Sequence, residues 1–116
     1  MGRKYALVSI VFRGKQVDGV KAFIDTGADF TVISTRIAKK LGIKDLGISL
    51  TWRASDGDDR KSPLVEIHMK MEGDNEFFLL EDVLVDDSPL DPENKEQVIL
   101  GLDYLQKSKK TLVFDD

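Results

Sequence analysis

The chain has 116 residues, 41% of them hydrophobic and 33% charged, and this composition predicts one compact domain over residues 1–116. Its net charge of −4 disfavours nucleic-acid binding, which depends on clustered lysines and arginines. Because the chain has no cysteine and one histidine, disulfides and thiolate metal sites are excluded, a zinc site is disfavoured, and we expect no metal and no cofactor.

The first predicted elements form a hairpin. The apolar run Tyr5–Phe12 predicts a strand and not a signal peptide, because it is short and lacks a small-residue cleavage site. Nothing approaches membrane-spanning length, so we expect no membrane contact and a cytoplasmic location. A turn at residues 13–16 leads into Val17–Ile24, whose alternating apolar residues predict a strand that ends at Asp25.

The stretch that follows combines an acid, a hydroxyl and a glycine where this strand should end. Gly27 permits a tight turn and close approach of another backbone, and the Thr26 hydroxyl can both donate and accept a hydrogen bond. The apolar, β-branched residues 30–33 then predict a second extended segment. The alternative interpretation is an ordinary hairpin corner in which Asp25 and Gly27 are only turn residues.

A short amphipathic helix is predicted next. Ser34 suits the N-cap position, apolar residues recur at helical spacing as far as Leu41, and Gly42 suits the position after the C-cap. The pattern of residues 43–50 indicates irregular or weakly extended structure.

A hairpin with a polar tip is predicted after Trp52. Residues 54–61 contain Asp56-Gly57, a strong hairpin-turn signal. The alternative to a functional role for this tip is a plain surface turn. Leu64–Glu72 alternates between apolar and polar residues and predicts a half-buried strand. His68 falls on its polar side, so we assign this histidine no role.

The remaining pattern predicts mainly strands. We expect a strand at Glu76–Val85, an exposed polar loop at residues 86–97, a buried strand at Val98–Leu100, a helical turn at residues 102–107 and a final strand at Thr111–Phe114.

Two motifs carry a family resemblance. Residues 25–29 (Asp-Thr-Gly-Ala-Asp), followed by Thr-Val-Ile at 31–33, resemble the active-site loop of the retropepsin-like (retroviral-type) aspartic proteases. Residues 98–105 resemble the hydrophobic-hydrophobic-glycine segment of the same family and the short helix after it. The resemblance covers nearly the whole chain, but the middle matches only in layout. It implies an all-β fold: a closed acid-protease barrel with one or two short helices and one lobe per chain.

The chemistry of such a site requires two carboxyl groups. Metal-free peptide hydrolysis needs one carboxylate to activate water and one carboxylic acid to protonate the carbonyl, and two adjacent carboxyls achieve this by sharing a proton. This chain has one Asp-Thr-Gly, so the second Asp25 must come from another copy across a twofold axis. We therefore expect a homodimeric endopeptidase that acts on an extended peptide or protein substrate.

The resemblance also implies roles for the neighbouring residues. Thr26 and Gly27 would complete the catalytic loop, and a flap would fold over the substrate. The implied substrate-binding residues are Ala28, Asp29, Phe30, Ser55, Asp56, Gly57 and Asp58. Structural support would come from Ile99, Leu100 and Gly101.

Several positions depart from the retroviral pattern. Leu102 stands where an arginine would pair with the acid at Asp29, Phe30 replaces a second acid, and the tip around Asp56 is more acidic than usual. Ala28 cannot donate a hydrogen bond to the catalytic carboxylates as a serine could, so we expect a working pH nearer neutral or mildly acidic than gastric. A protease-like peptide-binding or dimerisation module with little turnover remains the alternative function.

Overall fold

Seven strands and two short helices make up the part of the chain that the computed structural model describes, which comprises residues 4–44, 49–53 and 56–108. The predicted strand Thr111–Phe114 lies outside these residues. In chain order the elements are β1 (Tyr5–Phe12), β2 (Lys15–Ile24), β3 (Val32–Ile33), α1 (Thr35–Lys40), β4 (Ser49–Arg53), β5 (Asp59–Met71), β6 (Phe78–Val85), β7 (Val98–Leu100) and α2 (Leu102–Lys107).

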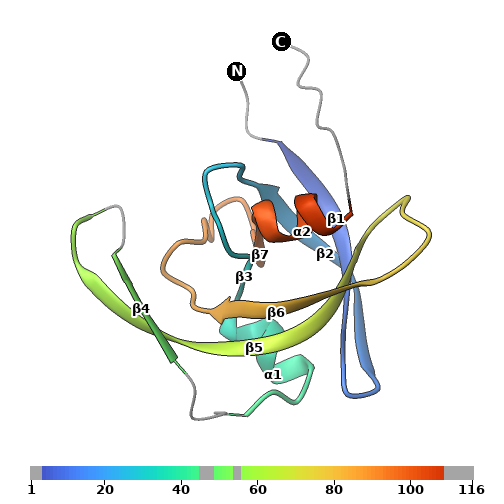
Figure 1. The fold of residues 1–116 in the computed structure, drawn as a ribbon, viewed down its shortest axis with the longest axis horizontal. Helices are drawn as coiled ribbons and strands as arrows, with labels where there is room; N and C mark the ends of the chain where they lie inside the picture. Colours follow the sequence, from blue (N-terminus) through green and yellow to red (C-terminus); the bar gives the residue numbers. More distant parts are fainter. Residues whose placement is uncertain (1–3, 45–48, 54–55, 109–116) are drawn as a thin grey trace.

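The strands form a sheet that closes on itself. The order is β1-β2-β7-β3-β6-β5-β4, and β5 also pairs with β1, which closes six of the strands into a barrel (Figure 1). Of the seven described strands, β4 alone stays outside this ring, where it pairs with the first part of the long, curved β5. The expected all-β closed barrel with two short helices is therefore confirmed.

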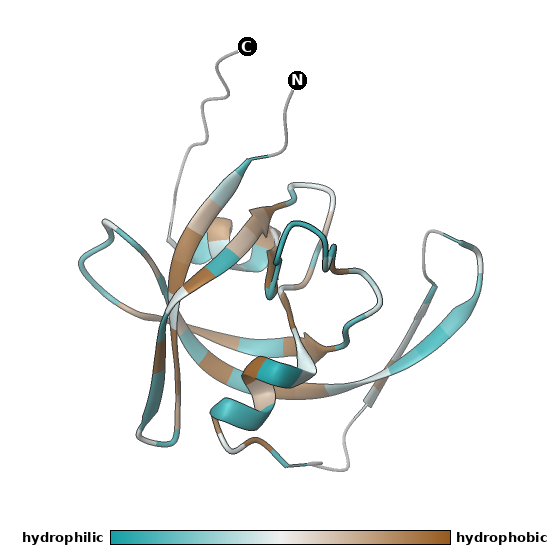
Figure 2. Ribbon diagram, turned by 180° about the vertical axis from the view of Figure 1, so that it is seen from behind, coloured by the Kyte–Doolittle hydropathy of each residue, from teal (hydrophilic) through white to brown (hydrophobic). Residues whose placement is uncertain are grey.

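The barrel is filled by the apolar face of alternating strands. In β5, Val65, Ile67 and Met69 are buried, while Glu66 and His68 are exposed, as the sequence pattern predicts. Figure 2 shows the same strand turning hydrophilic where it leaves the barrel to pair with β4. The barrel half of β5 thus belongs to the core, and its other half forms one arm of a projecting hairpin.

A short strand inserted between two others positions the loop after β2. β7 pairs in parallel with β2, through Ile24 opposite Leu100, and antiparallel with β3, through Val32 opposite Ile99. Its three apolar residues are all buried, so burial of their side chains holds β7 in place inside the barrel. The end of β2 and the start of β3 are consequently held on either side of one buried strand.

The first helix begins and ends as predicted. The Ser34 hydroxyl accepts a hydrogen bond from the Ile37 N–H at 3.1 Å, and Gly42 follows the C-cap with a φ of +71°, where a side chain would be strained. Asp87 reinforces the start of the helix by accepting from the Thr35 N–H (2.9 Å) and hydroxyl (2.7 Å).

The loop at residues 86–97 is less exposed than the sequence pattern predicts. Glu96 is only 2% exposed; its carboxylate accepts from the Tyr5 hydroxyl at 3.1 Å and from the Asp91 N–H at 3.0 Å. Since an internal carboxylate requires such partners, its burial ties the loop to β1. The loop is therefore exposed or partly exposed along most of its length, and the prediction of exposure is wrong at Glu96.

Several strand boundaries also differ from the predicted ones. β5 begins at Asp59 instead of Leu64, β6 begins at Phe78 instead of Glu76, and residues 49–50 belong to a regular strand. β2 also begins two residues earlier than predicted, at Lys15 instead of Val17. Among the described residues, no helix is long and apolar enough to cross a membrane.

Candidate active site

Asp25 lies immediately after β2, where the chain turns sharply. Its N–H donates to the Leu100 carbonyl at 3.0 Å, which fixes its backbone to β7. One oxygen of its carboxylate, Oδ1, accepts from the Gly27 N–H at 2.9 Å, and its carbonyl accepts from the Ala28 N–H at 3.1 Å. The side chain is half-buried, so the turn holds a carboxylate in a defined orientation while leaving it accessible.

Gly101 lets two backbone segments come together beneath this turn. A Cβ atom at Gly101 would lie 2.8 Å from the Ala28 carbonyl oxygen and 2.8 Å from the carbonyl carbon and oxygen of Phe30. Real Cβ atoms are not found so close to backbone, so no larger residue fits without movement. The next residue, Leu102, donates its N–H to the Ala28 carbonyl at 2.8 Å and joins the two segments directly.

A buried hydrogen-bond network that the sequence reasoning did not find fixes the far end of the loop. Thr31 is fully buried; its N–H donates to Asp103 Oδ2 at 3.0 Å and its hydroxyl to Asp103 Oδ1 at 2.7 Å. The same hydroxyl accepts from the Gly101 N–H at 3.2 Å. The sequence marks Asp103 as an acid in the predicted helical turn two residues after Gly101, but nothing local marks its pairing with Thr31.

A cleft of about 600 Å³ opens beside Asp25. Its walls come from the loop after β2, from the hairpin strand β4 and from the strand ends of the barrel, and most of them are apolar. The lining residues are Phe23, Asp25, Gly27, Ala28, Asp29, Phe30, Val32, Leu50, Trp52, Arg53, Leu84, Pro89 and Ile99. A cleft of this size with a few polar groups suits a ligand with apolar side chains.

The structure brings together only some of the predicted site residues. Ile99 joins the residues of the loop in lining the cleft, while Leu100 and Gly101 support the loop from the buried side. Thr26 is exposed and does not line the cleft. Ser55 lies outside the described residues.

The described residues of the hairpin tip form a tight turn that takes no part in lining this cleft. Gly57 takes a φ of +88°, as a tight turn requires, and the Asp56 carboxylate accepts from the Asp58 N–H at 3.0 Å and from Arg60 at 2.7 Å. The backbone hydrogen bond from Asp58, together with the charge and hydrogen bond of Arg60, lowers the pKa of Asp56 from its ordinary value. Asp56, Gly57 and Asp58 are all exposed and none of them lines the cleft, so their contact with a substrate would need closure of the hairpin.

A second network at the base of the hairpin also escaped the sequence reasoning. The Trp52 indole donates to the Ser62 hydroxyl at 2.8 Å, and that hydroxyl donates to Asp86 Oδ2 at 2.6 Å. Partial burial by itself would raise the pKa of Asp86, but the hydrogen bonds from Ser62 and Ser88 and the charge of Arg60 outweigh it and lower the pKa. The chain of contacts links β4, β5 and the loop after β6.

Asp29 lacks the arginine partner of the retroviral pattern, because Leu102 stands at that position. The acid is exposed, and within the described part of the chain it has no hydrogen-bond or ion-pair partner. The side chain of Leu102 packs against the main core, and only its backbone N–H contacts the loop. The carboxylate of Asp29 therefore faces the cleft without the arginine that the retroviral pattern would supply.

The described residues hold no cluster of three or more potential metal-ligating side chains.

Comparison with known structures identifies the same fold elsewhere. The protease of EIAV, in its complex with the inhibitor HBY-793, matches with a TM-score of 0.59 at 22% identity over 97% of this chain and 94% of that one. A retropepsin-like aspartic protease from Rickettsia conorii matches with a TM-score of 0.57 at 17% identity, over 98% of this chain and 85% of that one. The simian foamy virus (mac) protease matches with a TM-score of 0.55 at 17% identity, over 95% of this chain and 100% of that one.

Sequence comparison leads to the same group. DNA damage-inducible protein 1 of Kluyveromyces lactis is 27% identical over 110 residues, which are 93% of this chain and 25% of that protein. The chain thus spans about a quarter of the length of this curated relative. The family model described as "gag-polyprotein putative aspartyl protease" matches residues 10–107. With most of its length matched by that model, on a barrel shared with retroviral proteases, the chain belongs to the retropepsin-like aspartic protease family.

Proposed function

We propose that this protein is an aspartic endopeptidase whose active form is a homodimer. Two copies of Asp25, one from each chain, share a proton across a twofold axis and activate the attacking water. The ionised carboxyl removes a proton from this water while the other carboxyl donates its proton to the carbonyl oxygen of the scissile bond. The proposed mechanism uses no metal and no cofactor.

The observation that carries the proposal is the geometry of the Asp25 carboxylate. It lines the cleft, it is partly accessible, and the Gly27 N–H holds it at 2.9 Å on a turn fixed by β7. A reacting group must be both reachable and already oriented, and a simple hairpin corner would provide no such buried support. The exposed Thr26 and Gly27 beside it leave the loop open to a second copy.

The walls of the cleft suggest the class of substrate. Apolar groups from β4, β6 and β7 surround the cleft and favour an apolar side chain next to the scissile bond. Asp29 and Arg53 lie among them and offer an acceptor and donors to the main chain of an extended peptide. Phe30 adds an exposed aromatic surface at the same edge, in keeping with an apolar subsite.

Cleavage of an unfolded protein over the range pH 3–8, by the wild type and by Asp25→Asn, tests the proposal. This substitution keeps the size of the side chain but removes the ionisable group, so cleavage should fall by at least about 100-fold. Asp18→Asn is the matched control: Asp18 is an exposed acid on β2 that does not line the cleft, and this variant should keep full activity.

The outcome separates the endopeptidase from the alternative function. Equal cleavage by the Asp25→Asn variant and the wild type would refute the proposed mechanism. Tight binding of peptides without turnover by the wild type would instead support a protease-like binding module. A statine-type inhibitor, which mimics the tetrahedral intermediate, should bind the wild type and lose affinity for Asp25→Asn.

A further inference from the structure

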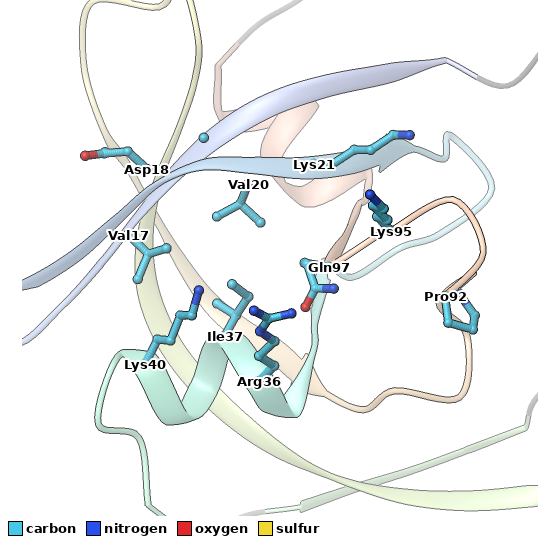
Figure 3. A pocket seen from close by; sticks show the side chains of 11 residues that line it. Val17, Asp18, Val20, Lys21, Arg36, Ile37, Lys40, Pro92, Lys95 and Gln97 are labelled. Atoms are coloured by element: carbon cyan, nitrogen blue, oxygen red, sulfur yellow. The ribbon is translucent and has the colours of Figure 1, made fainter.

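A second pocket of about 620 Å³ lies between β2, α1 and the loop before β7 (Figure 3). It shares no lining residue with the cleft beside Asp25. Its lining residues are Val17, Asp18, Gly19, Val20, Lys21, Arg36, Ile37, Lys40, Pro92, Lys95 and Gln97. The volume falls in the range of small-molecule sites, which is about 300–1,000 Å³.

The charge of this pocket is opposite to that of the whole chain. The net charge of the chain is −4, yet four lining side chains are cationic and only Asp18 is anionic. The Asp18 carboxylate accepts from the Gln16 amide at 2.8 Å, and Figure 3 shows it directed away from the pocket. The cations of the pocket are therefore not neutralised by its one acid.

Two of the cations lie one helical turn apart on the same face of α1. Arg36 and Lys40 are both exposed, and Figure 3 shows them pointing toward β2, across the pocket. Like charges at this spacing on a helix repel each other. Among the residues that the structure describes, neither Arg36, Lys40 nor Lys95 has an ion-pair partner. A bound anion would relieve this repulsion.

The other polar groups of the pocket differ in how available they are. Lys21 places its ammonium 4.3 Å from the centre of the Tyr5 ring, so this cation is held by the ring and adds positive charge only at the edge of the pocket. The Gln97 side-chain oxygen accepts from the Ser34 hydroxyl at 2.7 Å, which fixes the amide so that its NH₂ group serves as the donor. In Figure 3 this amide lies between Arg36 and Lys95.

The floor of the pocket is apolar. Val20 is 5% exposed and Ile37 3% exposed, and both belong to the barrel core, while Val17 packs against the same core at the mouth. Because Val20 and Ile37 are already almost covered, the apolar surface that a ligand could cover is that of Val17 and Pro92, and a bare inorganic anion would leave it in contact with water. A ligand with an apolar body would cover it and gain the free energy of burial.

We propose that this pocket binds a small phosphorylated molecule, with its phosphate between Arg36, Lys40 and Lys95 and its apolar body over the floor. Arginine matches phosphate oxygens in a bidentate geometry, and lysines add point charges, so this set of donors favours a phosphate over a single carboxylate. The site is independent of the proposed proteolysis, because it uses a different pocket and different residues.

Phenyl phosphate is the probe, because it joins a phosphate to an apolar ring. Titration into the ¹⁵N-labelled full chain, followed by NMR, should shift the amide signals of α1, of residues 17–21 and of residues 95–97. Phenyl phosphate should bind at least about threefold more tightly than inorganic phosphate, because only its ring covers the floor. Arg36→Gln and, separately, Lys95→Gln should each weaken binding about tenfold.

Lys39→Gln is the matched control, since Lys39 is an exposed lysine on the same helix that does not line the pocket. It removes the same charge and should leave the affinity for phenyl phosphate within about twofold of the wild type. Equal weakening by Lys39→Gln and Lys95→Gln would overturn the proposal in favour of general charge attraction.

Two further outcomes would also contradict it. Equal affinities for inorganic phosphate and phenyl phosphate would show that the floor takes no part. Tighter binding of a hexaglutamate peptide than of phenyl phosphate would instead identify the pocket as a docking site for an acidic protein segment. Lys95 lies on a loop and Arg36 on a helix, so failure of one variant to fold leaves the other as the test.

Discussion

At the scale of single residues, the candidate site depends on the bonding of one buried threonine. Thr31 has both of its donors satisfied by Asp103 and its hydroxyl lone pair used by the Gly101 N–H. The loop that carries Asp25 is thereby tied to α2 at its far end, as it is tied to β7 at its near end. An acid in this position acts as a bidentate acceptor, which neither asparagine nor alanine can reproduce.

Replacing Asp103 should therefore destabilise the protein by an amount that depends on the acceptors that remain. Asp103→Ala leaves two buried donors of Thr31 without a partner and should cost about 2 kcal/mol or more of unfolding free energy, whereas Asp103→Asn keeps one acceptor and should cost about 1 kcal/mol. Urea unfolding at pH 7 measures both values.

The control for this experiment is Asp82→Ala, which removes an exposed acid from β6 and should change the stability by less than about 0.5 kcal/mol. Thr31→Val, alone and combined with Asp103→Ala, completes a double-mutant cycle. Additive losses in that cycle would mean that the two side chains do not support each other.

The residues of the site differ in how visible they are in the sequence. Asp25 and Gly27 follow an alternating strand within a compact motif, so their local pattern identifies them. Asp103 and Thr31 are separated by 72 residues, and they meet only because β7 is inserted between β2 and β3. No local pattern encodes that insertion, and the pairing of the two side chains became evident only from the structure.

At the scale of elements, the projecting hairpin is attached through polar contacts. Ser62 is 1% exposed and lies where β5 leaves the barrel; it receives a hydrogen bond from Trp52 on β4 and donates one to Asp86 after β6. Trp52 also lines the cleft, so this chain of contacts fixes one cleft wall with respect to the barrel. The hairpin tip has no comparable anchor among the described residues.

Ser62→Ala should raise the pKa of Asp86 toward its ordinary value. Burial opposes ionisation of this carboxyl, and the hydrogen bond from Ser62 is the largest of the contributions that overcome it. Because the pKa is lowered in the folded state, the associated stability is present above about pH 4 and is lost as the pH falls through the folded pKa. The stability gap between wild type and variant should therefore narrow in acid, as NMR titration and unfolding at pH 7 and pH 3 can measure.

Trp52→Phe is the control for this prediction. It removes the indole donor but keeps the hydrogen bond from Ser62 to Asp86, so the pKa of Asp86 should remain lowered. An unchanged titration of Asp86 in Ser62→Ala would show that other groups, such as Ser88 or Arg60, set the pKa.

Elements whose apolar and polar residues repeat regularly could be predicted from the sequence. Segments whose burial depends on contacts with distant residues could not. The alternation of β5 and the capping residues of α1 follow from neighbouring side chains, and the structure confirms them. The loop at residues 86–97 has a polar composition that indicates exposure, yet Glu96 is buried by contacts with Tyr5 on β1, 91 residues earlier. Composition cannot reveal such a contact, because the same residues would be solvated in the absence of the barrel.

At the scale of the whole molecule, a single barrel supplies half of the proposed catalytic pair. The chain contains one Asp-Thr-Gly motif, and the loop that bears it is exposed at Thr26 and Gly27. The proposed endopeptidase mechanism therefore requires association of two copies, with the same surface of each in contact. Its activity should depend on protein concentration, because dissociation separates the two carboxyls.

Mixing active and inactive chains tests this requirement directly. If both copies of Asp25 are needed, equal amounts of wild type and Asp25→Asn, unfolded and refolded together, should retain about one quarter of the activity of the same total amount of wild type, because random pairing leaves about one dimer in four intact. If each chain acted alone, about one half would remain. Wild type refolded with Lys39→Gln, whose change lies on α1 and outside both pockets, should keep full activity. A mixture that retains one half of the activity, with exchange of subunits shown by mass spectrometry, would rule out a catalytic pair shared between two chains.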